Sequence, residues 1–135
     1  MSRKGILTIA VVIDVAVNAR TAGPVSAKAL ATRHKLLPRH LEPVLQALVH
    51  SGIVKGIRGP RSGYMLGREH RRISAENILR AAGSAEEAGE PPLPSSLLVV
   101  NNVVRPALAE AERSFSAALA RISVEDMAQR AKALK

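Results

Sequence analysis

The chain has 135 residues, of which 20 are Lys or Arg and 11 are Asp or Glu, so its formal net charge is +9. It contains no cysteine and no tryptophan, and only one tyrosine and one phenylalanine. The lack of cysteine excludes disulfides, thiolate-bound zinc or iron–sulfur clusters, and a cysteine nucleophile. Two aromatic residues are too few to form a surface on which the bases of single-stranded nucleic acid stack. The apolar content of 47% is typical of a folded protein.

The basic residues are concentrated in the first half of the chain. Residues 1–72 hold 13 Lys and Arg and three acidic residues, whereas residues 73–135 hold seven basic and eight acidic residues. All four histidines also lie in the first half. This asymmetry indicates a surface that binds a polyanion. A solvated basic surface that only aids solubility explains the charge equally well. The motifs must therefore decide between these two interpretations.

The N-terminal segment resembles a signal peptide, because basic residues precede a short apolar run. Asp14 lies inside that run, however, and the apolar residues of 6–17 recur at steps of three and four. Two apolar stripes on one helix predict a buried structural helix. No other stretch is long and apolar enough to cross a membrane, so we expect a cytoplasmic protein with no membrane partner.

Turn residues and caps predict a pair of short helices next. Residues 20–24 form a turn, Ser26 caps a helix over 27–33, and residues 34–37 interrupt it. A second helix begins at Pro38 and ends near Gly52. Its apolar residues form a single stripe, which consists of Leu41, Val44, Leu45 and Leu48.

Pro43 deletes one backbone hydrogen bond in the second helix, so its first turn is predicted to be irregular.

A β-hairpin and a further helix follow. Residues 53–58 and 64–66 have strand character and flank the turn residues of 59–63. Ser74 and Asn77 then start a short helix that carries Ile78, Leu79 and Ala82. The fold class predicted from this order is mainly α, a winged helix-turn-helix with a small two-stranded wing.

The last part of the chain predicts a long dimerisation helix. Residues 84–94 are acidic and rich in proline and glycine, as in a linker. Apolar residues then recur at steps of three and four from Leu97 to Ile122, a seam too long and one-sided for a small monomer to cover. Pro106 should kink or split this helix. We expect the homodimer contact to include Val100, Val104, Leu108, Ala111, Phe115 and Ile122.

A final helix is predicted after Ser123, which begins a capping box, with Met127 and Ala131 facing inward. The expected organisation is a DNA-binding winged helix-turn-helix domain over 1–83, a linker loop over 84–94 and dimerisation helices over 95–135.

Basic side chains fall where a winged helix exposes them. Lys28 lies on the first short helix, Arg39 and His40 begin the second, and Arg58 and Arg61 flank the hairpin turn. Winged helices place the second helix in the major groove of DNA, and wing arginines reach phosphates or a narrow minor groove. Any one of these residues fits a solvated surface, but their joint placement favours DNA binding.

The same region resembles the Rrf2 family of bacterial transcription regulators. The resemblance runs from about residue 4 to 83, and more loosely to 123. It rests on residues 14–17 (DVAV), 23–26 (GPVS), 40–42 (HLE), 52–54 (GIV) and above all 58–66 (RGPRSGYML).

The resemblance implies a homodimer that binds a palindromic operator near promoters, mostly as a repressor. It also implies that Arg58 enters the minor groove, while Arg39, His40 and Glu42 face the operator. The full set of DNA-binding residues that we predict is Lys4, Lys28, Arg39, His40, Glu42, Gln46, Arg58, Arg61 and Tyr64. Tyr64 is expected mainly to anchor the wing, with its hydroxyl near a phosphate as a lesser possibility.

The chain departs from the family in two places. Family wings often have three glycines before the tyrosine, where this chain has Arg61, Ser62 and Gly63. Many members also carry three cysteines between the wing domain and the long helix, and these ligate an iron–sulfur cluster. Because this chain has none, we expect no such cofactor.

Other kinds of site have little support in the sequence. His34, His40, His50 and Glu42 lack the spacing of metal ligands. Carboxylates in the 84–94 segment cannot be desolvated for catalysis, and no phosphate loop, nucleophile elbow or HExxH motif is present. We therefore expect no metal and no enzymatic activity.

Two alternatives stay open. The same fold can act as a sensor, with an unidentified small-molecule effector held where the wing domain meets the long helix. From another class, the chain can be a basic RNA- or ribosome-associated protein.

Overall fold

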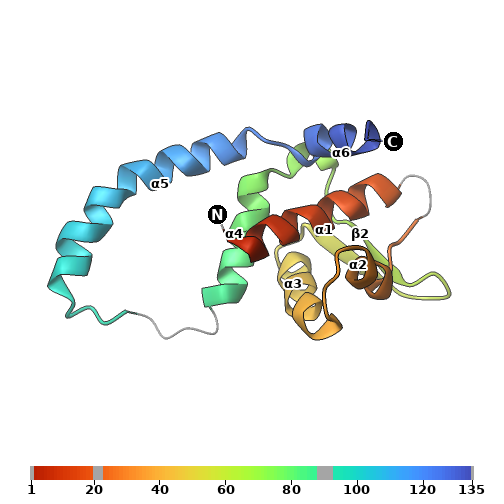
Figure 1. Ribbon diagram of the computed structural model, residues 1–135, viewed down its shortest axis with the longest axis horizontal. Helices are drawn as coiled ribbons and strands as arrows, with labels where there is room; N and C mark the ends of the chain where they lie inside the picture. Colours follow the sequence, from red (N-terminus) through yellow and green to blue (C-terminus); the bar gives the residue numbers. More distant parts are fainter. Residues whose placement is uncertain (1, 20–22, 88–92, 135) are drawn as a thin grey trace.

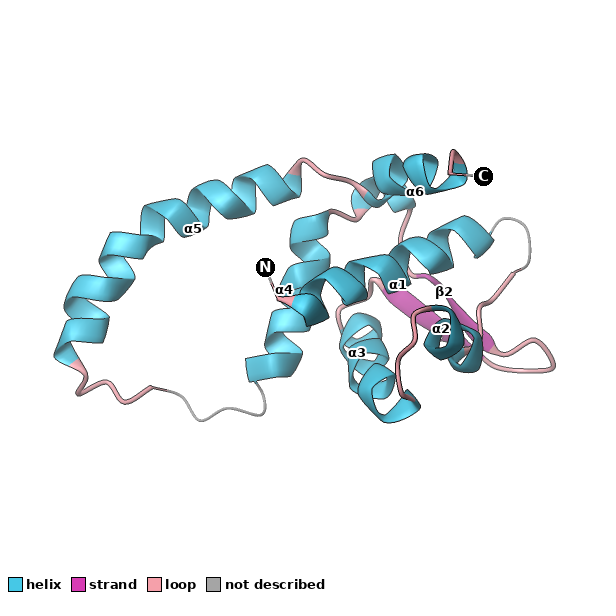
Figure 2. Cartoon of the chain, in the orientation of Figure 1, coloured by secondary structure: helices cyan, strands magenta, loops and turns pink. Residues whose placement is uncertain are grey.

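The computed structural model describes residues 2–19, 23–87 and 93–134 and has the predicted winged-helix fold (Figure 1). A bundle of helices and a two-stranded antiparallel sheet form the body, from which a long helix extends (Figure 2). The elements in chain order are α1 (Arg3–Ala19), α2 (Ala27–Arg33), α3 (Pro38–His50), β1 (Val54–Ile57), β2 (Gly63–Leu66), η1 (His70–Arg72), α4 (Ala75–Glu87), η2 (Val100–Val104), α5 (Arg105–Ala120) and α6 (Val124–Lys132).

Helix α1 is the centre of the body, as its two apolar stripes predict. Val11 and Val15 are fully buried in one cluster with residues of α2 and α3. Val12 is fully buried in a second cluster, which includes residues of α3, α4 and α6. Because both sides of the helix are covered, the apolar run near the N-terminus is explained by packing. Ile6, at the start of the run, is exposed.

The helix-turn-helix forms as the caps predict. The Ser26 hydroxyl accepts a hydrogen bond from the Ala29 amide (3.1 Å) at the start of α2. Pro38 begins α3, and the predicted apolar stripe of α3 is buried. The helix continues through Pro43, and its start holds one tight turn in which the His40 amide donates to the Leu37 carbonyl (2.9 Å). Of the turn expected over 20–24, residues 20–22 lie outside the described part of the chain.

The wing is a hairpin anchored to the body through β2. Strand β1 pairs with β2 in the register Val54 to Leu66 and Ile57 to Gly63. On the other edge of β2, the Tyr64 amide donates to the Val25 carbonyl (2.8 Å), and the Val25 amide donates to the Tyr64 carbonyl (3.0 Å). A Cβ at Gly63 would lie 2.7 Å from the Val25 carbonyl, so glycine is required there. The side chain of Tyr64 packs against both core clusters, which is the predicted anchor.

Helix α4 begins at the predicted caps but extends further than predicted. The Ser74 amide donates to Asn77 Oδ1 (3.0 Å), and the Asn77 amide donates to Ser74 Oγ (3.1 Å). The helix reaches Glu87, inside the segment expected to be a linker over 84–94. Alanine and glutamate dominate residues 81–87 and favour a helix, which outweighs the loop character of the residues after them. Residues 88–92 lie outside the described part of the chain.

The long helix near the C-terminus is curved and is not split at Pro106 (Figure 1). Residues 100–104 adopt π-helical geometry, in which the Arg105 amide donates to the Val100 carbonyl. This wider turn precedes the proline and keeps the helix continuous with α5. No residue of η2 or α5 is buried.

The final helix returns to the body, which the domain division did not foresee. Ser123 caps α6 as predicted, by accepting from the Asp126 amide (3.1 Å). The Val124 amide donates to the Ile73 carbonyl (2.7 Å), and Val124 and Ala128 are buried in the cluster around Val12. Helix α6 therefore shares a core with the winged helix. Met127 and Ala131, expected to face inward, are only half-buried.

Candidate nucleic-acid interface

The solvent face of α3 carries three of the predicted site residues. Arg39, Glu42 and Gln46 are spaced by three and four, so they share one face of the helix. All three are exposed, whereas the opposite stripe of α3 is buried. Pro38 at the first helical position and the buried stripe together fix which residues α3 presents to solvent.

Five of the basic side chains predicted to bind DNA are exposed and lack ion pairs within the described part of the chain. Arg39 and His40 lie in the first turn of α3, while Arg58 and Arg61 lie at the tip of the wing. Lys28 is exposed on α2. None of these five makes an ion pair with another described residue. The positive charges of Lys28, Arg39, Arg58 and Arg61 are therefore available to an external anion.

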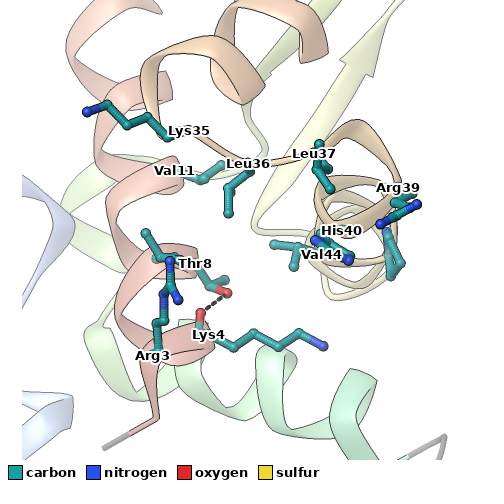
Figure 3. Close-up of a pocket in the computed structure, with 12 residues that line it drawn as sticks. Arg3, Lys4, Thr8, Val11, Lys35, Leu36, Leu37, Arg39, His40 and Val44 are labelled. Carbon is teal, nitrogen blue, oxygen red and sulfur yellow. Dashed lines mark hydrogen bonds between the residues drawn. The ribbon is translucent and has the colours of Figure 1, made fainter.

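Two grooves flank α3 and divide the remaining predicted residues between them. A groove of about 460 Å³ between α2 and α3 is lined by Lys28, Glu42 and Tyr64, among others. A larger groove of about 640 Å³ between α1 and α3 is lined by Lys4, Arg39 and His40, among others (Figure 3). Lys4 and Tyr64 are half-buried. Gln46, Arg58 and Arg61 line neither groove.

An ionic network that the sequence analysis did not identify positions α2. The Arg33 guanidinium donates to both carboxylate oxygens of Asp14 (2.6 and 2.8 Å), which raises the pKa of Arg33 above its ordinary value. His34 Nε2 lies 2.9 Å from Asp14 Oδ2, and the Asn18 amide donates to Asp14 Oδ1 (2.9 Å). The Asp14 side chain is only 7% exposed. The sequence feature that could have indicated this network is Asp14 itself, because it is the only acidic residue in the apolar run of 6–17.

Arg68 has a similar positioning role at the other end of α3. Its guanidinium donates to the Ser51 carbonyl (3.1 Å), just after the last residue of α3. A cation at the carbonyl end of a helix is favourable because it opposes the helix dipole. This contact holds the chain after β2 against the helix that precedes the wing.

The expected dimerisation residues form an exposed apolar face. Leu108 and Phe115 are 50% and 53% exposed, and Val104 and Ile122 are each 42% exposed. Ala111 is exposed and Val100 is half-buried.

Within the described residues, no three His, Asp or Glu side chains are grouped so as to hold a metal ion. None of the described helices combines the length and apolar character needed to span a membrane.

An exposed helix after a tight turn, followed by a basic hairpin, defines the class of winged helix-turn-helix proteins. The chain matches the model of the Rrf2 family, described as an iron-dependent transcriptional regulator, over residues 1–130. The chain therefore belongs to the Rrf2 family.

Curated relatives match about 60% of the chain. It is 30% identical over 88 residues to the HTH-type transcriptional regulator IscR of Klebsiella pneumoniae, which covers 65% of this chain and 53% of that protein. It is 36% identical over 80 residues to the HTH-type transcriptional regulator CymR of Bacillus subtilis, covering 59% and 57% of the two chains. The chain thus spans little more than half the length of the curated relatives it matches. These relatives are named as transcriptional regulators and not as enzymes, in agreement with the expectation for this chain.

Solved structures resemble the chain over nearly its whole length. The IscR of T. potens has a TM-score of 0.74 and 29% identity, covering 100% of this chain and 90% of that one. CymR of B. subtilis, described as its global cysteine regulator, has a TM-score of 0.71 and 27% identity, covering 96% of both chains. The likeness confirms the winged-helix fold together with the extended C-terminal helix.

Proposed function

We propose that this protein is a homodimeric regulator of transcription that binds a palindromic operator in double-stranded DNA and acts as a repressor. The observation that carries the proposal is the set of exposed, unpaired basic side chains on α2, α3 and the wing. Membership of the Rrf2 family supports regulation of transcription as the role.

In this proposal α3 enters the major groove with its N-terminal residues foremost. Arg39, Glu42 and Gln46 face the base edges, because they occupy the solvent face of α3. Arg58 and Arg61 at the tip of the wing reach the adjoining minor groove and its phosphates. Lys4, Lys28 and His40 flank α3 and supply further contacts to the backbone. Tyr64 holds the wing in place.

The homodimer forms along η2 and α5. Their apolar residues are exposed in the single chain, and a second copy related by two-fold symmetry covers them with the same residues. Two-fold symmetry then sets the two half-sites about one or two turns of DNA apart.

Regulation by a thiolate-bound iron–sulfur cluster is excluded for this chain, since it has no cysteine. The proposed regulator binds DNA without a cluster, so its input is of another kind or absent.

Footprinting of the purified protein on DNA upstream of its own and neighbouring genes tests the proposal. We expect protection of two symmetric half-sites and a reduced transcript in an in vitro transcription assay with that DNA. If each dimer neutralises about 6–10 phosphates, affinity falls by about 10³–10⁵ between about 50 and 200 mM salt. Preference for single-stranded RNA would contradict the proposal and favour the RNA-associated alternative. A monomer in size-exclusion chromatography with light scattering would contradict the dimer.

A further inference from the structure

The groove between α1 and α3 has a cationic rim. Arg3 and Lys4 come from the first turn of α1, Lys35 from the turn after α2, and Arg39 and His40 from the first turn of α3. Among the side chains that the structure describes, no acidic residue lines the groove. Figure 3 shows the Lys4 side chain extending across from α1 towards α3, whereas the Lys35 side chain points away from the space between the two helices.

The floor of the groove is apolar. It is formed by Leu7, Val11, Leu36, Leu37, Pro43 and Val44. The Thr8 hydroxyl also lines the groove, but its hydrogen is donated to the Lys4 carbonyl (2.7 Å). The charged groups left to bind a ligand are therefore cationic, and they lie beside a surface that favours an apolar body. A volume of about 640 Å³ lies in the range of small-molecule sites.

The cations of the rim lack protein partners. Arg3, Lys4, Lys35 and Arg39 form no ion pair with another described residue. Close to an apolar floor, the attraction between such cations and an anion is stronger than in open water. A guanidinium also matches a carboxylate with two parallel hydrogen bonds. A neutral or cationic ligand would leave this charge uncompensated.

We propose that this groove binds a small organic carboxylate, with its apolar body on the Leu7 and Val44 side and its carboxylate among Arg3, Lys4 and Arg39. Arg39 and His40 also belong to the set proposed to contact DNA. A ligand that engages them therefore weakens operator binding, and operator binding weakens the ligand by the same factor. This coupling rests on the proposed function, whereas the binding site itself does not. The proposed site places the effector between α1 and α3, and not where the wing domain meets the long helix.

Calorimetric titration of the full chain with 4-phenylbutyrate, without DNA, tests the site. The matched probes are 4-phenylbutyramide, which has the same body without the charge, and acetate, which has the charge without the body. We expect 4-phenylbutyrate to bind and to raise the melting temperature with increasing concentration, and both matched probes to bind at least about tenfold more weakly. Equal binding of the acid and the amide, or no binding of the acid, would overturn the site.

A variant locates the binding. Arg3→Gln should weaken the affinity for 4-phenylbutyrate about tenfold, since one charged hydrogen-bond partner is lost. Arg130→Gln, on the exposed face of α6, makes the same change of net charge outside the groove and should leave the affinity unchanged. Equal losses in both variants would indicate nonspecific attraction and overturn the site.

Displacement from the footprinted operator tests the coupling. Saturating 4-phenylbutyrate should release the protein from DNA, and half-release should need about tenfold more probe in Arg3→Gln than in Arg130→Gln. Binding of the probe without release would overturn the coupling and leave the site. Failure of the protein to bind DNA without any probe would instead contradict the proposed function.

Discussion

The winged-helix body and the long α5 helix use apolar residues in opposite ways. In the body, side chains such as Val12, Leu48 and Ile78 are fully buried against other elements of the same chain. Along α5, Leu108 and Phe115 are half exposed and no residue is buried. Similar helical periodicity therefore serves two purposes. In the body, other elements of the same chain cover the apolar residues, whereas along α5 they stay exposed and form the face that we propose as the dimer contact.

The two regions also differ in how they use charge. The body pairs the buried Asp14 with Arg33 and His34, and it leaves several exposed basic side chains without an ion-pair partner among the described residues. On α5, Glu110 and Glu112 lie close in sequence to Arg113, so no excess of one sign develops. In the proposed complex, long-range attraction to DNA therefore comes from the body, and α5 contributes through the geometry of the proposed dimer.

Phe115→Glu should produce the largest effect, because it places a charge in the proposed dimer contact. We expect the variant to elute as a monomer and to bind the operator about 10²–10⁴-fold more weakly, since two linked half-sites become independent. Its melting temperature at low concentration should change little. Ala117→Glu, about half a helical turn away on α5, is the matched control and should remain dimeric. If the Phe115→Glu protein remained dimeric, the apolar face of α5 would not be the dimer contact.

Val124→Ala tests whether α6 belongs to the body. Val124 is fully buried in the cluster around Val12, so loss of two methyl groups should lower the free energy of unfolding by about 2–3 kcal/mol. Urea unfolding followed by circular dichroism measures this loss. Leu134→Ala is the control, since Leu134 is 85% exposed and lies outside both the buried clusters and the proposed dimer contact. Equal stability of the two variants would show that α6 does not share the core.

Arg58→Ala tests the reach of the wing. The side chain is exposed and has no partner among the described residues, so its removal should leave the fold intact. We expect a loss of about 1–3 kcal/mol in specific binding, measured by gel-shift titration on the footprinted operator. Arg113→Ala on α5 supplies the control for a lost positive charge. Unchanged operator affinity in Arg58→Ala would refute the assignment of the wing.

Asp14→Asn should have the smallest effect. The substitution removes a charged acceptor from Arg33 and His34, and Arg33 is 47% exposed, so water partly replaces the lost contact. We expect the free energy of unfolding to fall by about 1–2 kcal/mol in thermal or urea unfolding. Asp126→Asn, exposed in the first turn of α6, is the control. No loss of stability would show that the network does not hold α2 on α1.

The sequence predicted most of the local structure and less of its assembly. Ser26, Pro38, Ser74 with Asn77, and Ser123 mark where helices start, because a cap depends on residues only two or three positions away. Residues 59–63 marked the turn of the wing for the same reason. The linker was predicted to begin at residue 84, but α4 continues to Glu87. The prolines that indicate a linker lie after Glu87, and the alanine and glutamate residues before them favour a helix.

The candidate site was predicted residue by residue, but not as an arrangement. Exposure of Arg39, Arg58 and Arg61 follows from the pattern of apolar residues around them. The pairing of Asp14 with Arg33 and His34 joins residues 19 and 20 positions apart, so no local pattern reveals it. The groove between α1 and α3 is equally invisible in the sequence, because it depends on how two separate helices face each other.

By itself, the sequence determined the winged-helix class, the basic half and the apolar seam of the long helix, since periodicity, caps and composition act over short distances along the chain. Only the tertiary structure decided that α6 returns to α1, that Asp14 holds the end of α2, and that Arg3, Lys4 and Arg39 surround one groove. These features depend on which distant surfaces bury each other. That choice is made by the shape and packing of the whole fold.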